Sequence, residues 1–149
     1  MKILVAVDGS EHALDAVRFA LRLHQAGLNA SSVLATVQEQ TYLYEMMIAP
    51  NSDVLERISG AAGSRALAGA QALFDSAGVA YTREIGSGEP APVLIELAQI
   101  HGCDAIVLGA RGLGALRRAL IGSVSQGVLN GSSLPVTIVK KIVASSPVP

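Results

Sequence analysis

Residues 3–10 read ILVAVDGS, five apolar residues that run directly into an acidic turn. An uninterrupted apolar run, rather than an alternating one, is typical of a strand covered on both faces, as in a parallel sheet. Similar runs occupy residues 33–37, 105–108 and 136–139. A weaker run at 79–84 alternates between apolar and polar residues, which predicts a strand nearer an edge of the sheet.

Segments with helical periodicity separate these strands. Residues 11–26, 64–77, 91–101 and 123–130 place apolar residues at helical spacing, and each segment is followed by a glycine. Ser10 stands where the first helix needs an N-cap. This alternation predicts a single α/β domain with an open parallel sheet, right-handed crossovers and helices on both faces.

Residues 39–63 fit the alternation least well. Pro50 breaks the segment, and Gly60 and Gly63 would each cost a helix about 1 kcal/mol relative to alanine. We therefore expect a mobile insert over 39–63. The chain's last residues, 144–149, are predicted to form a disordered tail.

The composition excludes several classes of protein. The chain has 149 residues, of which 50% are hydrophobic and 15% charged, so it can bury enough apolar surface to fold alone. The net charge is -1, so the chain has no excess of basic residues that could bind nucleic-acid phosphates, which argues against a nucleic-acid partner.

The same composition predicts no membrane partner and a cytoplasmic location. No apolar run approaches the roughly 18 residues of a membrane span, and Asp8 ends the first run too early for a signal peptide. The single cysteine, Cys103, cannot form an internal disulfide or a CxxC metal site, which suits a reducing compartment.

Two turns are candidates for ligand binding, because open α/β sheets bind ligands beyond the carboxyl ends of their strands. Asp8 offers a carboxylate to a ribose or a base edge, although a carboxylate there also serves simply to turn the chain. Residues 109–114 (GARGLG) hold three glycines, which let the backbone approach a ligand or form a flexible connection. The chain contains neither a P-loop nor a dinucleotide-binding glycine fingerprint.

The start of the last predicted helix adds an anion site. Residues 122–125 read GSVS, and a helix amino terminus presents backbone N–H groups and a positive dipole end. Ser123 and Ser125 are predicted to donate to phosphate oxygens, the alternative being that Ser123 only caps the helix. Arg111 is the arginine best placed to reach a phosphate.

The spacing Gly109-x2-Gly112-x9-Gly122-Ser123 resembles the nucleotide-binding signature of the universal stress protein family. The opening strand with its acidic turn and the closing strand are also similar to that family, so the resemblance covers residues 1–143 as one domain. It implies a Rossmann-like, five-stranded parallel sheet in the order 3-2-1-4-5. It also implies a homodimer that forms through the last strand, Val136 to Val139.

The resemblance further implies that the chain binds ATP, together with Mg²⁺. The residues that the resemblance assigns to adenine and ribose are Ala6, Val7, Asp8, Val37, Leu108 and Gly109. Those that it assigns to the phosphates are Arg111, Gly112, Gly122, Ser123, Val124 and Ser125.

Three functions are then open. The first is an ATP-binding protein with a regulatory or protective role in a stress response and at most slow ATP hydrolysis. The second is an efficient enzyme, which would need a general base or metal carboxylates near the phosphates, where Asp8 is the one candidate. The third is an interaction module that acts through its dimer and the 39–63 insert without nucleotide turnover.

Overall fold

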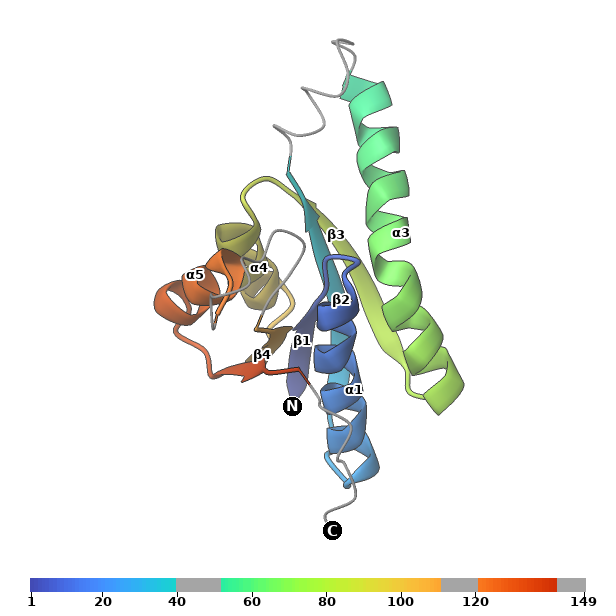
Figure 1. The fold of residues 1–149 in the computed structure, drawn as a ribbon, viewed down its shortest axis with the longest axis vertical. Coiled ribbons are helices and arrows are strands. Elements are labelled where there is room, and N and C mark those ends of the chain that lie inside the picture. Colours follow the sequence, from blue (N-terminus) through green and yellow to red (C-terminus); the bar gives the residue numbers. More distant parts are fainter. Residues whose placement is uncertain (40–51, 111–120, 142–149) are drawn as a thin grey trace.

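The computed structural model describes residues 1–39, 52–110 and 121–141, and the predicted tail at 144–149 lies outside them (Figure 1). Five parallel strands form one sheet in the order β3-β2-β1-β4-β5, which confirms the predicted fold class. In chain order the elements are β1 (Lys2–Ala6), α1 (Glu11–Gln25), β2 (Ser31–Gln38), α3 (Ser52–Ala77), β3 (Tyr81–Ser87), α4 (Pro90–Ile100), β4 (Ala105–Gly109), α5 (Ser123–Gly131) and β5 (Val136–Val139).

Helices α1 and α3 cover one face of the sheet, and α4 and α5 cover the other (Figure 1). Alternate residues of β1 enter the two hydrophobic cores: Ile3 and Val5 pack with α1 and α3, whereas Leu4 and Ala6 pack with α4 and α5. Apolar burial on both faces is the reason that the central strands carry unbroken apolar runs.

Strand β3 lies at one edge of the sheet, as its alternating pattern predicts. The strand begins at Tyr81 and ends at Ser87, later at both ends than the predicted 79–84. Gly86 continues the strand by pairing with Val37 of β2. Val93 of α4 packs directly over this glycine, where an added Cβ would lie 2.6 Å from Val93 Cγ1.

Helix α3 begins at Ser52 rather than at residue 64, so the second half of the expected insert is helical. Gly63 is compatible with a helix because it lets α3 lie close to the sheet: a Cβ on Gly63 would lie 2.6 Å from Ile85 Cγ2 on β3. Packing of this kind offsets the low helix propensity of glycine. Residues 40–51 of the insert lie outside the described residues.

One buried hydroxyl gives a first testable prediction. Thr36 of β2 is fully buried, and its Oγ1 has no hydrogen-bond partner in the described part of the chain. Replacing Thr36 by valine removes this unsatisfied group, so we expect Thr36→Val to raise the free energy of unfolding by about 1 kcal/mol. Chemical denaturation measures the change, with Thr82→Val on the exposed side of β3 as the control. A less stable Thr36→Val protein would contradict the prediction.

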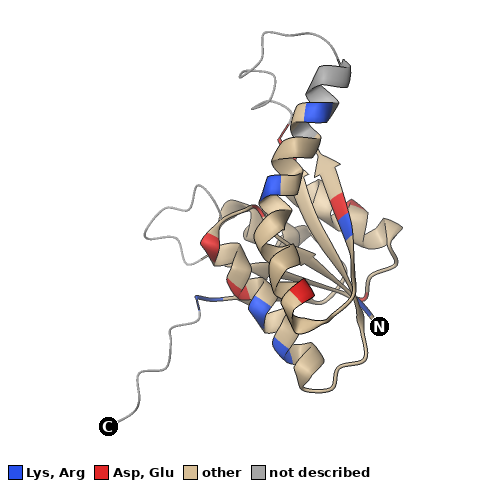
Figure 2. Ribbon diagram, turned by 90° about the vertical axis from the view of Figure 1, so that its right-hand side faces the viewer, with Lys and Arg blue, Asp and Glu red and all other residues tan. Residues whose placement is uncertain are grey.

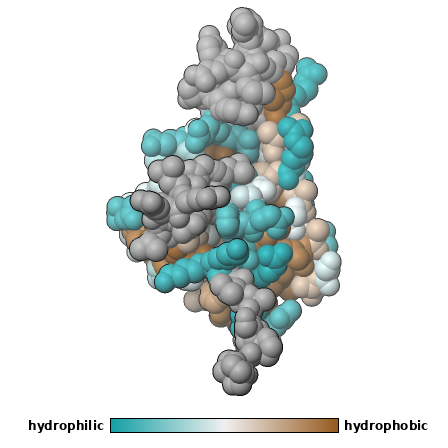
Figure 3. All heavy atoms as spheres, in the orientation of Figure 1, coloured by the Kyte–Doolittle hydropathy of each residue, from teal (hydrophilic) through white to brown (hydrophobic). Residues whose placement is uncertain are grey.

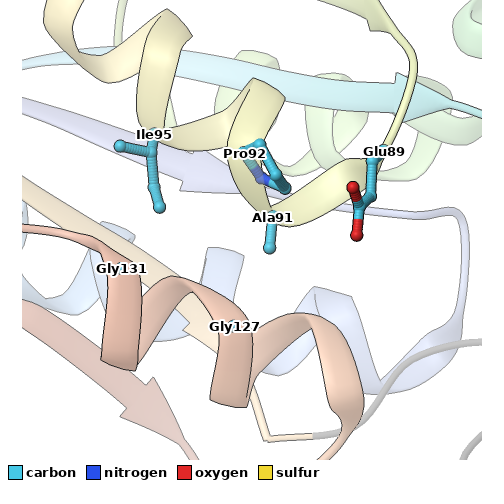
Figure 4. Close-up of a pocket in the computed structure, with 6 residues that line it drawn as sticks. All are labelled: Glu89, Ala91, Pro92, Ile95, Gly127 and Gly131. Carbon is cyan, nitrogen blue, oxygen red and sulfur yellow. The ribbon is translucent and has the colours of Figure 1, made fainter.

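Small residues bring α4 and α5 close together on their face of the sheet. A Cβ added to Gly127 would lie 2.7 Å from Ala91 Cβ, and one added to Gly131 would lie 3.0 Å from Ile95 Cδ1. A groove of about 450 Å³ lies between residues of α4 and α5. Figure 4 shows the two helices side by side with the residues that line the groove. The residues that line it are Glu89, Ala91, Pro92, Ile95, Gly127 and Gly131.

This close approach makes Gly127→Ala a second prediction. Neither the new methyl group nor Ala91 Cβ can rotate away, so α5 must shift, and we expect a loss of stability of about 1–3 kcal/mol. The double variant Gly127→Ala with Ala91→Gly removes the overlap and should recover most of that loss in a thermal melt. If the double variant is as unstable as the sum of the two single changes, the helices do not meet at this point.

Charged residues occur along the helices and on β3 (Figure 2). On the face that Figure 3 shows, hydrophobic residues appear as separate patches among hydrophilic ones. Within residues 1–39, 52–110 and 121–141, no helix is both long and apolar enough to cross a membrane.

Candidate functional site

The carboxyl ends of three adjacent strands form the floor of the candidate site. Ala6 at the end of β1 pairs with Ala35 of β2 on one side and with Leu108 of β4 on the other. The Val7 N–H extends the first pairing by donating to the Ala35 carbonyl at 2.9 Å. This register brings Ala6, Val7 and Leu108, which lie far apart in sequence, to one edge of the sheet, where all three are buried.

The turn from β1 to α1 sets the position of Asp8. Gly9 adopts a φ of 87°, a conformation that favours glycine, and it lies against α3, where an added Cβ would be 3.3 Å from Ala66 Cα. The Ser10 N–H donates to Asp8 Oδ1 at 2.9 Å, and Ser10 Oγ accepts from the Ala13 N–H at 3.2 Å. Ser10 is therefore the N-cap of α1, as predicted. Asp8 accepts a hydrogen bond within the turn and is half-buried just beyond the carboxyl end of β1.

Two short hydrogen bonds tie the start of α5 to the end of β4. The Gly122 N–H donates to the Ala110 carbonyl at 2.6 Å, and the Ser125 hydroxyl donates to the Gly109 carbonyl at 2.6 Å. The Ala110 N–H in turn donates to the Val139 carbonyl of β5 at 2.9 Å. The amino end of α5 is thus held at the same edge of the sheet as Asp8.

Gly122, and not Ser123, is the N-cap of α5, which overturns the alternative that Ser123 caps this helix. Ser123 instead occupies the first helical position, with its side chain exposed. The first N–H groups of a helix have no acceptor within the helix, and its dipole is positive at this end. Together with the Ser123 hydroxyl they form an arrangement suited to an anion.

The remaining predicted residues differ in what they offer a ligand. Ser125 is buried and its one hydroxyl proton is donated to Gly109, while Val124 is half-buried against the α4 and α5 core. Val37 pairs with Gly86 near the end of β2 and packs on the same core. Arg111 and Gly112 lie outside the described residues.

Sequence reasoning missed the contacts that join distant segments at this edge. Nothing in the local sequence marks Ala66 as the neighbour of Gly9, or the carbonyls of Gly109 and Ala110 as acceptors for α5. Such contacts follow from the packing of whole elements, and no motif or periodicity encodes them.

The described residues offer little for metal or thiol chemistry. Across the described ranges, no group of three or more His, Cys, Asp or Glu residues could hold a metal ion. Cys103 is buried just before β4, and burial raises the pKa of its thiol above the usual range. Its thiolate fraction at neutral pH is therefore small, and the side chain acts as a small buried apolar group.

Sequence comparison identifies relatives along nearly the whole chain. The model of the universal stress protein family matches residues 1–140. The universal stress protein YxiE of Bacillus subtilis is 32% identical over 149 aligned positions, which cover 93% of this chain and 98% of that protein.

Solved structures share the fold. A universal stress protein crystallised in complex with cAMP is 27% identical, with a TM-score of 0.69 and coverage of 93% of this chain and 96% of that one. An Arabidopsis thaliana family member with AMP bound has a TM-score of 0.66 over 99% of this chain and 95% of its own, and at 19% identity it is evidence for the fold alone.

Proposed function

Because the chain belongs to the universal stress protein family, we propose that it binds an adenine nucleotide, ATP in particular, at the carboxyl ends of β1, β2 and β4. The observation that carries this proposal is that the Asp8 turn and the amino end of α5 follow the carboxyl ends of two paired strands, β1 and β4. A carboxylate suits hydroxyl and amine donors, whereas a helix amino terminus suits anions. A nucleotide has both kinds of group at opposite ends.

In the proposed complex, Asp8 accepts a hydrogen bond from the ribose, and the backbone around Ala6, Val7 and Val37 contacts the adenine. Leu108 and Gly109 lie along the ribose. The phosphates lie on Gly122, Ser123 and Val124, to which Arg111 and Gly112 of the signature contribute. Ser123 is exposed and Asp8 is half-buried, so both side chains remain accessible to a ligand. Their accessibility supports Asp8 as the ribose contact and Ser123 as a phosphate contact.

We further propose that Mg²⁺ accompanies the triphosphate. This ion keeps several water molecules and is commonly bound through phosphates and one or two carboxylates, so it does not need a cluster of protein ligands. Phosphate oxygens and water molecules would supply its ligands, and the ion would neutralise phosphate charge.

The proposed output is regulation or protection in a stress response, with ATP hydrolysis slow at most. Fast phosphoryl transfer needs a positioned base and several charged groups around the γ-phosphate. Asp8 is the only acidic candidate among the predicted site residues. We also propose that the chain forms a homodimer through β5, an edge strand of the sheet, and that it acts in the cytoplasm.

Calorimetric titration of the purified chain with ATP, AMP, cAMP and adenosine, with and without Mg²⁺, tests the proposal. The expected result is saturable binding of one nucleotide per chain, strongest for ATP with Mg²⁺. Absence of binding at millimolar nucleotide would overturn the proposal and favour an interaction module that acts without a nucleotide. The cAMP complex of the 27% identical relative makes cAMP the essential competitor: tighter binding of cAMP than of ATP would also contradict the choice of ATP.

A further inference from the structure

Ser125 is the second serine of the GSVS segment, and the sequence predicts that it donates a hydrogen bond to a phosphate. In the structure its hydroxyl already donates to another group. The side chain is 4% exposed and donates to the Gly109 carbonyl at 2.6 Å, a distance at the short end for a hydroxyl hydrogen bond. A serine hydroxyl has a single proton to donate. While this bond stands, Ser125 presents only lone pairs to a phosphate, and those repel phosphate oxygens.

We propose that Ser125 is a positioning residue that latches α5 onto the end of β4 and does not itself donate to a phosphate, unlike Ser123, which the proposed function already places there. This inference rests on the proposed nucleotide site and specifies how that site is built. The Ser125–Gly109 bond and the Gly122–Ala110 bond form the latch, one on each side of the exposed Ser123.

The latch has two effects on an anion at this edge. It fixes the position of the first turn of α5 relative to the end of β4. It also occupies the carbonyl oxygens of Gly109 and Ala110, whose partial negative charge would otherwise oppose a phosphate. Neither effect requires Ser125 to touch the nucleotide.

Three single variants separate the roles. Ser125→Ala breaks the latch and Ser123→Ala removes the exposed hydroxyl. Ser132→Ala is the matched control at the opposite end of α5, where Ser132 Oγ accepts from the Leu134 N–H at 3.0 Å. For each variant, amide hydrogen exchange at Gly122 is measured without nucleotide, and the affinities for ATP and adenosine are measured by titration.

For Ser125→Ala, we expect Gly122 in the free protein to exchange about tenfold faster, and the ratio of ATP to adenosine affinity to fall about tenfold. For Ser123→Ala, we expect the same fall in that ratio with exchange at Gly122 unchanged. Ser132→Ala should alter neither quantity by more than about twofold.

Two results would overturn the inference. Unchanged exchange at Gly122 in Ser125→Ala would show that no latch exists in the free protein. Faster exchange with an unchanged affinity ratio would show that the bond is structural only and does not position the phosphate site. If the unmodified chain binds neither ligand, the proposed function fails instead, and the exchange data alone still decide whether the latch exists.

Discussion

Replacing Ser123 by aspartate is expected to lower the affinity for ATP roughly 100-fold while leaving the affinity for adenosine within about twofold of the original. Ser123 occupies the first position of α5 with its side chain exposed. Two unit charges about 4 Å apart interact by about 4 kcal/mol near a protein surface, so a carboxylate placed against the phosphates would be strongly repelled.

The same change should leave the free protein intact. A carboxylate in the first turn of a helix interacts favourably with the helix dipole, by about 0.3–1 kcal/mol, and the first turn of α5 contains no acidic residue. We therefore expect the free energy of unfolding without nucleotide to be unchanged or slightly raised, while ATP binding collapses. A combination of intact stability and lost ATP affinity separates a local charge effect from general damage.

Ser123→Asn is the matched control, because it has nearly the same shape as the aspartate variant without the charge. It should lose no more than about tenfold in ATP affinity. Equal ATP affinity in the aspartate variant and the original chain would mean that the phosphates do not lie at the amino end of α5.

The largest expected effect on stability comes from Phe74→Ala, which should lower the free energy of unfolding by about 3–5 kcal/mol. Phe74 of α3 is fully buried, and its ring meets the Tyr81 ring edge-on at 5.5 Å between centroids. A second edge contact joins it to His24 of α1 at 6.4 Å. The side chain thus fills the space where α1, α3 and β3 meet, and its loss leaves a cavity that these elements cannot easily close.

Chemical denaturation monitored by circular dichroism measures this loss. Phe19→Ala is the control, since Phe19 is the other phenylalanine of the chain and is only half-buried on α1. It should cost clearly less than Phe74→Ala. A loss below about 1 kcal/mol for Phe74→Ala would contradict the packing of α3 against the sheet.

The sheet was predictable because its strands are marked by composition. The runs in β1 and β4 are unbroken and that in β2 is interrupted by Thr36 alone over residues 33–37, because both faces of the sheet need apolar residues. The start of α3 was not predictable in the same way, because Gly63 weakens a helix by propensity but allows it to approach Ile85. Local patterns record the propensity of a residue and not the neighbour that it meets.

The candidate site, too, could be predicted from the sequence only in part. Asp8 and the GSVS segment are visible in the sequence, and the strand register brings them to one edge as expected for a parallel sheet. The partner of the Ser125 hydroxyl is the Gly109 carbonyl, 16 residues earlier in the chain. The sequence motif therefore suggests two equivalent serines, whereas burial and hydrogen bonding distinguish a latch from an exposed donor.

The proposed nucleotide lies between the Asp8 turn and the amino end of α5. Titration of the isotopically labelled chain with ATP and Mg²⁺, followed through its backbone amide NMR signals, locates the ligand on the fold. We expect saturable shifts concentrated at residues 7–10 and 122–126. Shifts confined to the groove between α4 and α5, or no shifts at saturating ATP, would contradict this position.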